Sequence, residues 1–237
     1  MEEQIEKLGT IVSIWAHPDD ETYLAGGIMA AAAELGQRVV CVSATEGEHG
    51  TDDPVAWPPE RLGRTRRWEA AAAMAVLGVT DHRFLGYPDG GMAALDPEEP
   101  VARIAALLVD VAPDTVLTFG PDGGTFHPDH QTISAWVGAA WERAGRPGRL
   151  LHATMTAEHL ETWGERYEQW RVFMTDERPV GVTPEDLALD LRLTGVALDR
   201  KIAALLAMHT QVAPAVALLG IDDYRDLNAG EAFIEAP

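Results

Sequence analysis

Short apolar runs alternate with longer helical patterns along most of the chain, and this alternation most constrains the fold. Strands are expected at 10–15, 38–44, 82–85, 115–119, 150–155 and 187–193. Helices are expected at 22–35, 62–77, 98–111, 129–144, 158–170 and 197–208. Strands separated by helices favour a mostly parallel sheet with helices on both faces. We therefore predict a three-layer, Rossmann-like α/β fold with 187–193 as an edge strand; the segment after 208 has no clear pattern.

Length and composition limit the organisation and the partners. The 237 residues contain no linker-like stretch, so we predict one domain over residues 1–237. The single cysteine, Cys41, lies in an apolar run and cannot form an internal disulfide, which favours a buried thiol and a cytoplasmic protein. No apolar run approaches the roughly 20 residues of a membrane helix. A net charge of −20 repels phosphate backbones, so nucleic acid is not an expected partner. A homo-oligomer is left open.

Three consecutive acids follow the first apolar run. The stretch "AHPDDETYLAGG", residues 16–27, places Asp19, Asp20 and Glu21 directly after the strand expected at 10–15. Adjacent carboxylates repel one another, and a bound cation is one way to offset that repulsion. Ligands of doubly wound sheets gather beyond the carboxyl ends of the strands, which is where this stretch lies. A second such stretch is the glycine-, proline- and acid-rich loop expected over 45–60.

The tripeptide His-Pro-Asp occurs twice, at 17–19 and at 127–129, each time between an expected strand and an expected helix. One interpretation is structural, because proline and acids both favour the first turn of a helix. The other is a metal site, because imidazole and carboxylate suit zinc and also iron(II). The second interpretation is favoured by the repetition of the motif after two different strands.

A catalytic zinc usually has three protein ligands and one open position for water. His17 and Asp20 are three residues apart, so a tight turn can aim both at one point. His130 can supply the third ligand from the other segment, although spacing alone does not separate it from His127. Asp19 is then a free carboxylate beside a metal-bound water, which is what a general base requires. The histidine that is not a ligand can stabilise an oxyanion or protonate a leaving amine.

The pair "AHPDDE" and "HPDH" resembles the LmbE-like (PIG-L type) zinc-dependent N-deacetylases, which remove acetyl groups from molecules that contain N-acetylglucosamine. The resemblance implies that His17, Asp20 and His130 are the metal ligands. It also implies that Asp19 is the general base and that His127 assists the oxyanion and the leaving group. This agrees with the interpretation drawn from the residues themselves.

Weaker matches to the same family suggest substrate contacts. Arg66, in "RRWEAAAAMAVLGV", is matched to a residue that meets substrate hydroxyls, and Asp89, in "YPDGG", to one that binds sugar hydroxyls. Glu48 lies at the mouth of the 45–60 loop, and His209 and Gln211 lie in "KIAALLAMHTQ", which resembles a late Lys…His-x-Gln segment of the family. The alternatives are a surface salt bridge, a plain turn, a solvated acid and a helix end without a role.

One departure from the family concerns the oxyanion. Some sugar deacetylases of the family carry tyrosine two residues before the first histidine of "HPDH", where this chain has Thr125. A phenolic hydroxyl, if one is used, must come from elsewhere, and Tyr87 is a candidate.

We therefore predict a zinc-dependent hydrolase that removes the N-acetyl group from an N-acetylglucosamine-type sugar derivative. The alternatives are an amide hydrolase for another N-acyl substrate, such as a natural product or thiol conjugate, and a non-catalytic metal-binding module. The chain has no nucleophile elbow, and "GPDGG" lacks the lysine of a phosphate loop.

Overall fold

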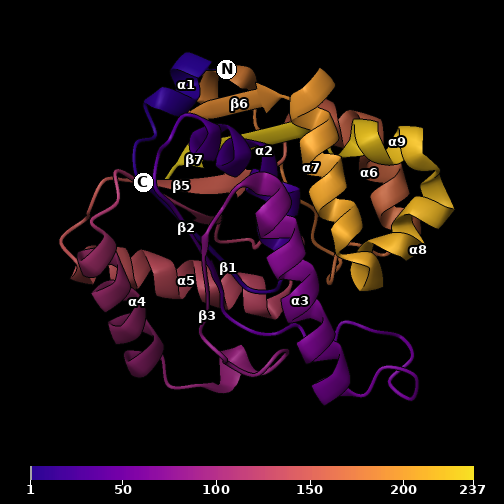
Figure 1. The fold of residues 1–237 in the computed structure, drawn as a ribbon, viewed down its shortest axis with the longest axis horizontal. Coiled ribbons are helices and arrows are strands. Elements are labelled where there is room, and N and C mark those ends of the chain that lie inside the picture. The colour runs from indigo at the N-terminus through magenta and orange to yellow at the C-terminus, as the bar shows by residue number, and fades with distance from the viewer. Residues whose placement is uncertain (1) are drawn as a thin grey trace.

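A seven-stranded sheet runs through the computed structural model, which describes residues 2–237 (Figure 1). Its spatial order is β3-β2-β1-β4-β5-β7-β6. The strands are β1 (Ile11–Trp15), β2 (Val39–Ser43), β3 (Asp81–Phe84), β4 (Thr115–Phe119), β5 (Arg149–Thr154), β6 (Leu189–Arg192) and β7 (Gly230–Glu235). The first five strands pair in parallel, and β7 is antiparallel to both β5 and β6. The prediction of a mostly parallel α/β sheet is confirmed.

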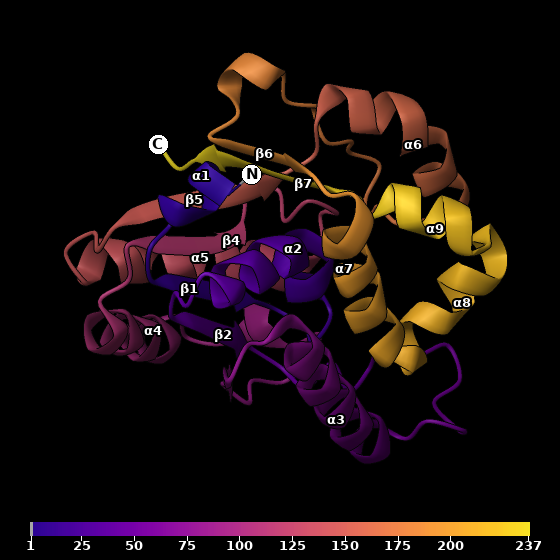
Figure 2. The same cartoon turned by 45° about the horizontal axis from the view of Figure 1, so that its top comes forward.

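Helices form the two outer layers (Figure 1). Three of them pack against one another on one side of the sheet: α2 (Asp20–Glu34), α3 (Pro59–Leu77) and α7 (Gly195–Ala207). Two more pack together on the other side, α4 (Glu98–Val111) and α5 (Pro128–Arg143). The remaining helices are α1 (Glu2–Glu6), α6 (Ala157–Gln169), α8 (His209–Leu219) and α9 (Ile221–Leu227), with short 3₁₀ turns at Met92–Ala94 and Pro184–Asp186. Figure 2 shows α6, α8 and α9 together at its right side.

The central strands are buried over their whole length, as strands covered on both faces must be. Every residue of β1, β2 and β4 is buried, including Cys41, whose free thiol was expected in the core. The rings of Trp15 and Phe119, at the ends of β1 and β4, meet edge to face at 4.9 Å. This aromatic contact joins the two central strands directly beneath the segments that carry the paired motifs.

The C-terminal part adds elements that the sequence did not predict. The edge strand expected at 187–193 is confirmed as β6, at one end of the strand order. After α7 come α8, α9 and β7, and β7 inserts between β5 and β6 instead of extending the edge. The 45–60 loop has no helix or strand until α3 begins at Pro59.

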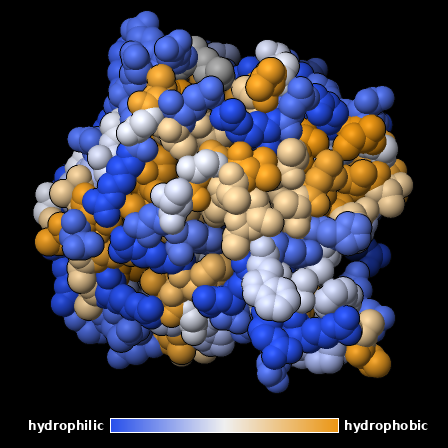
Figure 3. Space-filling view, in the orientation of Figure 1, coloured by the Kyte–Doolittle hydropathy of each residue, from blue (hydrophilic) through white to orange (hydrophobic). Residues whose placement is uncertain are grey.

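Within residues 2–237, no single helix is long and apolar enough to cross a membrane. The pair α7 and α8 meets the length and composition together, but the two helices are bent by 117°. Figure 3 shows apolar side chains on the surface at its right, over α8 and α9. The exposed large apolar residues of these three helices are Val196, Leu206, Leu218 and Ile221.

Candidate metal and catalytic site

The paired motifs lie where the strand order reverses. The chain leaves β1 toward β2 on one side, and it leaves β4 toward β5 on the other. The two connections diverge at the carboxyl ends of β1 and β4, which is the usual position of the ligand crevice in such sheets. His17 and Asp20 follow β1 at the start of α2, and His130 follows β4 in the first turn of α5. The strand order therefore brings together residues more than a hundred positions apart.

Three side chains converge in this crevice. His17 Nδ1 lies 3.1 Å from His130 Nε2. The carboxylate of Asp20 reaches both rings, with Oδ2 3.5 Å from His17 Nδ1 and Oδ1 3.5 Å from His130 Nε2. Two ligands of a tetrahedral zinc with bonds of about 2.0–2.1 Å lie roughly 3.4 Å apart. The separations therefore fit three ligands of one ion.

The far nitrogen of each histidine has its own acceptor. His17 Nε2 faces Asp89 Oδ1 at 3.1 Å and Asp129 Oδ2 at 3.4 Å. His130 Nδ1 lies 3.0 Å from the carbonyl oxygen of Gly123. Metal-binding histidines usually donate their other N–H to a carboxylate or a carbonyl, which fixes the tautomer and the ring orientation. This arrangement leaves His17 Nδ1 and His130 Nε2 free to bind a cation.

The charges around these nitrogens favour a positive ion at the same point. Burial opposes protonation of His17, but bonds to Asp129, Asp20 and Asp89 outweigh it and raise its pKa well above the ordinary value. Burial also opposes ionisation of Asp20, and here the neighbouring His130 and His17 outweigh it and lower its pKa. Burial lowers the pKa of His130 to about 4. Metal binding displaces such protons, so affinity will depend on pH.

Other donor sets overlap this one. His17, His127 and His130 offer nitrogens within 4.8 Å of one another, and so do atoms of His17, Asp89 and Asp129. The set with Asp20 accounts best for the contacts, because it leaves each histidine one nitrogen for the ion and one for its acceptor. His127 instead accepts the backbone N–H of Asp129 at its Nδ1, as the N-cap of α5.

Asp19 stands beside the ligands in a strained conformation. Its backbone φ angle is 145°, a value that residues other than glycine rarely adopt. Such backbone strain persists only where the surrounding structure holds the residue in place. Its backbone N–H donates to Glu21 Oε2 at 3.1 Å, and its Oδ2 lies 3.1 Å from Arg66 Nη2. Burial raises the pKa of Asp19 to about 6, although the Arg66 charge opposes the shift. A carboxylate with a pKa near neutrality suits proton transfer.

Arg66 holds two loops together. It is 3% exposed, and its guanidinium donates to the carbonyls of Gly47 at 2.8 Å and Pro18 at 2.7 Å. Gly47 has a φ of 63°, and a Cβ there would overlap the guanidinium, so this approach requires glycine. The Nε of Arg66 is buried without a hydrogen-bond partner in the described chain. The expected contact with substrate hydroxyls stays a prediction, and the structure adds this bracing function.

Asp89 and Glu48 connect the loops at the rim. Asp89 Oδ2 accepts the backbone N–H of His49 at 2.8 Å, while its own N–H donates to Glu48 Oε1 at 3.0 Å. Gln211, from α8, donates to the carbonyl of Gly50 at 3.2 Å and so holds the same loop. His209 is exposed at the start of α8. The structure thus joins Asp89 and Glu48 to the crevice directly and Gln211 through the loop; the substrate contacts of all four residues remain predictions.

Sequence reasoning missed two acids. Asp129 has no predicted role in the site, yet its carboxylate accepts the N–H of Gly90 at 2.7 Å and faces His17. Its place in a repeated His-Pro-Asp motif was the available signal. Glu21 is 0% exposed, and burial raises its pKa to about 8. Tyr87, the candidate phenol, donates to Glu99 at 2.8 Å.

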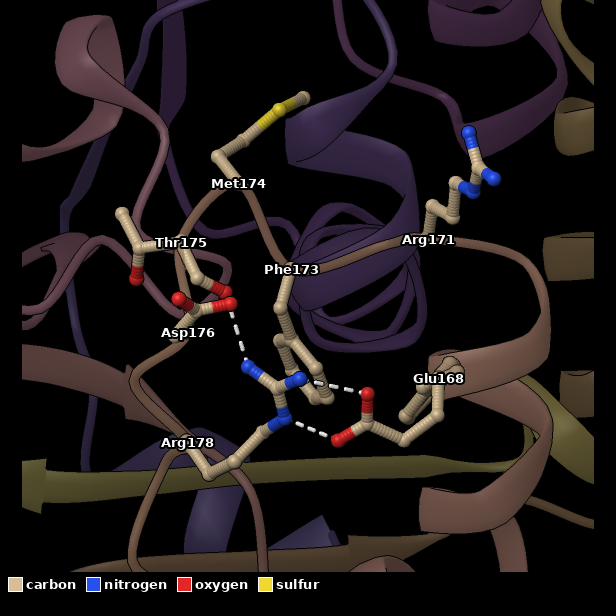
Figure 4. A pocket seen from close by; sticks show the side chains of 8 residues that line it. Glu168, Arg171, Phe173, Met174, Thr175, Asp176 and Arg178 are labelled. Atoms are coloured by element: carbon tan, nitrogen blue, oxygen red, sulfur yellow. Dashed lines mark hydrogen bonds and ion pairs between the residues drawn. The ribbon is translucent and has the colours of Figure 1, made fainter.

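A hollow of about 420 Å³ lies beside the second motif, between the end of α6 and residues 173–178 (Figure 4). Arg178 crosses it, paired with Glu168. Met174, which lines the hollow, donates its N–H to the carbonyl of Thr125 at 2.9 Å. Thr125 Oγ1 in turn lies 3.4 Å from His130 Nδ1.

Comparison with known proteins agrees with this geometry. A family model described as "PIG-L: GlcNAc-PI de-N-acetylase" matches residues 12–141, more than half of the chain. A curated protein of Kineococcus radiotolerans, named 1D-myo-inositol 2-acetamido-2-deoxy-alpha-D-glucopyranoside deacetylase, is 40% identical over 89% of this chain and 71% of its own length.

Two solved structures are similar in fold. N,N'-diacetylchitobiose deacetylase from Pyrococcus horikoshii has a TM-score of 0.66 at 18% identity, covering 99% of this chain and 86% of its own. The 4-carboxy-2-hydroxymuconate hydratase GalB from Pseudomonas putida has a TM-score of 0.65 at 21% identity, covering 97% and 96%. Because these two names describe different reactions, the fold alone does not choose between them.

Proposed function

The chain belongs to the PIG-L family, and from this premise we propose that it is a metal-dependent N-deacetylase acting on an N-acetylglucosamine-type sugar derivative. The observation that carries the proposal is the cluster of side chains at the carboxyl ends of β1 and β4. Two imidazoles and one carboxylate converge there at ligand spacing, and a second carboxylate, Asp19, lies beside them without joining the set.

His17, Asp20 and His130 would hold the metal. A divalent cation bound there would lower the pKa of a water and would polarise the acetyl carbonyl. Nitrogen and carboxylate donors suit zinc, which we propose as the ion, and iron(II) is the alternative. The contacts from Asp89, Asp129 and the Gly123 carbonyl hold both rings so that His17 Nδ1 and His130 Nε2 face each other.

Asp19 acts as the general base. It takes a proton from the attacking water, whose oxygen bonds to the acetyl carbon. His127 has Nε2 free, since Nδ1 accepts the N–H of Asp129, and it stabilises the developing oxyanion. The C–N bond then breaks, and the amine leaves with a proton from Asp19 or His127 while acetate remains. Arg66 limits the movement of Asp19 throughout, through its contact with Oδ2.

The substrate is a small N-acetylated sugar derivative, as the name of the Kineococcus relative suggests. We assign the gripping of sugar hydroxyls to Arg66 and Asp89, and the outer rim to Glu48, His209 and Gln211. The contacts that support this assignment are those that Asp89, Glu48 and Gln211 make in and around the 45–60 loop. The proposal keeps the cytoplasm as the location and includes no nucleic-acid or membrane partner, because a net charge of −20 repels both phosphate backbones and anionic lipid.

The experiment measures metal content and then free-amine release from a panel of N-acetylated sugars, N-acyl natural products and N-acyl thiol conjugates. About one metal per chain with amine release from acetylated sugars supports the proposal. Release only from the other amides shifts the substrate class. Metal without any release would leave a binding module. Asp19→Ala should keep the metal and lose turnover, and an active Asp19→Ala protein would contradict the assignment of the base.

A further inference from the structure

We propose that the buried ion pair between Lys201 and Glu231 is a positioning device that sets the first turn of α2, and through it Asp19 and Asp20, for catalysis. The pair joins α7 and β7 to the middle of α2. The inference rests on the proposed function where it concerns catalysis, but the position of the turn can be measured without it.

The ion pair is enclosed completely. Lys201 Nζ lies 2.8 Å from Glu231 Oε1, and both side chains are 0% exposed. Glu231 comes from β7, the strand that inserts between β5 and β6, and Lys201 comes from α7. A fully buried ion pair rarely adds net stability, because removing two charges from water costs about as much as their attraction returns. Its presence therefore calls for a structural or functional reason.

The pair also enters the hydrogen-bond ladder of α2. Glu231 Oε1 accepts the N–H of Gly27 at 2.7 Å, and Oε2 accepts the N–H of Ile28 at 2.8 Å. Lys201 Nζ donates to the carbonyl of Tyr23 at 2.7 Å. In a regular helix the N–H of Gly27 bonds directly to the carbonyl of Tyr23. Here the ion pair inserts between α2 and its neighbours α7 and β7, and it links these same two groups through a chain of three short bonds.

Two adjacent glycines make room for this insertion. A Cβ at Gly26 would lie 3.4 Å from Lys201 Cγ, and a Cβ at Gly27 would overlap Leu193. Glycine in a helix interior costs about 1 kcal/mol relative to alanine, so the glycines are not there to strengthen the helix. They allow α7 and the end of β6 to approach α2 at the level of the ion pair.

The insertion acts one turn away from the catalytic acids. The carbonyl of Asp19 accepts the N–H groups of Thr22 and Tyr23, each at 2.9 Å. The carbonyl of that same Tyr23 is the group that Lys201 holds. A short path of backbone bonds therefore runs from the ammonium group to the strained Asp19 peptide. Such strain requires surroundings that fix it, and the ion pair fixes the far end of the turn.

The test compares a double variant, Lys201→Met with Glu231→Leu, with the parent and with Leu108→Ala. The double variant removes both charges at once, so no unpaired charge remains buried. Leu108 is 0% exposed in α4, on the opposite side of the sheet, so its truncation weakens the fold without touching α2.

We expect the double variant to unfold at a temperature equal to or above that of the parent. Its kcat should nonetheless fall about tenfold or more, while its KM stays within about twofold of the parent. Its zinc affinity, measured by chelator competition, should also fall about tenfold or more. Leu108→Ala should lower the unfolding temperature and leave both values per folded molecule unchanged. A stable double variant with parental kcat and zinc affinity would overturn the proposal, and so would losses that track only the folded fraction.

A further readout separates this inference from the proposed function. Amide hydrogen exchange of Thr22 and Tyr23 should accelerate in the double variant relative to the parent, whatever reaction the protein performs. If the parent releases no amine from any substrate but exchange and zinc affinity change as expected, the proposed function fails and the positioning role stands. Unchanged exchange and affinity would overturn the positioning role alone.

Discussion

The two His-Pro-Asp segments have the same three residues and opposite environments. In the first, Asp19 has a φ of 145° and makes no side-chain cap for α2. In the second, His127 is a regular N-cap at a φ of −66°, and Asp129 is 0% exposed and accepts backbone N–H groups of Gly90 and Met92. Burial raises the pKa of Asp19, whereas for Asp129 bonds from His17 and Gly90 outweigh burial and lower it.

The difference shows that the neighbours determine what an acid can do. The Asp129 carboxylate is held by amides and an imidazole, so it stays ionised and orients His17. The Asp19 carboxylate faces one arginine, and there burial together with the neighbouring Asp20 charge outweighs the arginine and raises its pKa. Pairs of acids whose surroundings push their pKa values apart are typical of sites that divide chemical work between them.

The largest expected effect is the loss of turnover when Asp19, and not Asp129, is replaced. Asp19→Asn should lower kcat by about 10²–10⁴-fold, because an amide cannot take a proton from water. Its zinc affinity should stay within about threefold of the parent. Steady-state amine release and chelator competition measure the two quantities. A kcat within tenfold of the parent would show that the base lies elsewhere.

The next effect concerns metal affinity. Asp129→Asn should weaken zinc binding about 10–100-fold, since the amide orients His17 less firmly than the carboxylate does. The matched control is Asp19→Asn, the equivalent position of the first segment. Equal losses of affinity in both variants would remove the distinction drawn between the segments.

A smaller effect appears in the pH profile. A base must be ionised, so kcat/KM should fall about tenfold per pH unit below the pKa of Asp19. Burial raises that pKa to about 6 in the metal-free protein. A bound cation favours the carboxylate, so the acidic limb is expected at pH 6 or lower. An acidic limb of kcat/KM above pH 7 would contradict the assignment of Asp19 as the base, because burial raises the pKa of Asp19 only to about 6 and a bound cation would lower it.

The smallest effect is on stability. Asp19→Gly should be more stable than Asp19→Ala by about 1 kcal/mol, because glycine tolerates the positive φ. His127→Ala should lose about 1 kcal/mol, because it removes a helix cap. Urea unfolding at fixed metal concentration measures both. A stabilising His127→Ala would show that the second segment is as strained as the first.

The sequence predicted the first five strands, the edge strand and the meeting of the two motifs, because apolar period and strand order determine these. It did not predict β7. That strand places Glu231 in the interior, where a charged residue hides the apolar alternation by which strands are identified. The carboxylate is tolerated there only because Lys201 and two helix amides receive it, and these partners are 30 or more residues away in the chain.

The candidate site shows the same limit. The proposed ligand set follows from motif spacing and resemblance, but the positions of Asp89 and Asp129 against His17 depend on the turn at 88–91, where Gly90 donates its N–H to Asp129. Likewise, the helical spacing around Arg66 does not reveal that its guanidinium holds the Pro18 and Gly47 carbonyls. Contacts between a side chain and a distant backbone group produce no periodic pattern in the sequence, so they cannot be predicted from it.

The most direct test is a crystal structure of the zinc-loaded protein with anomalous scattering at the zinc edge. The ion should lie about 2.0–2.2 Å from His17 Nδ1, His130 Nε2 and an Asp20 oxygen, with Asp19 unbound. An ion on His17 Nε2 between Asp89 and Asp129, or one bound to Asp19, would contradict the account.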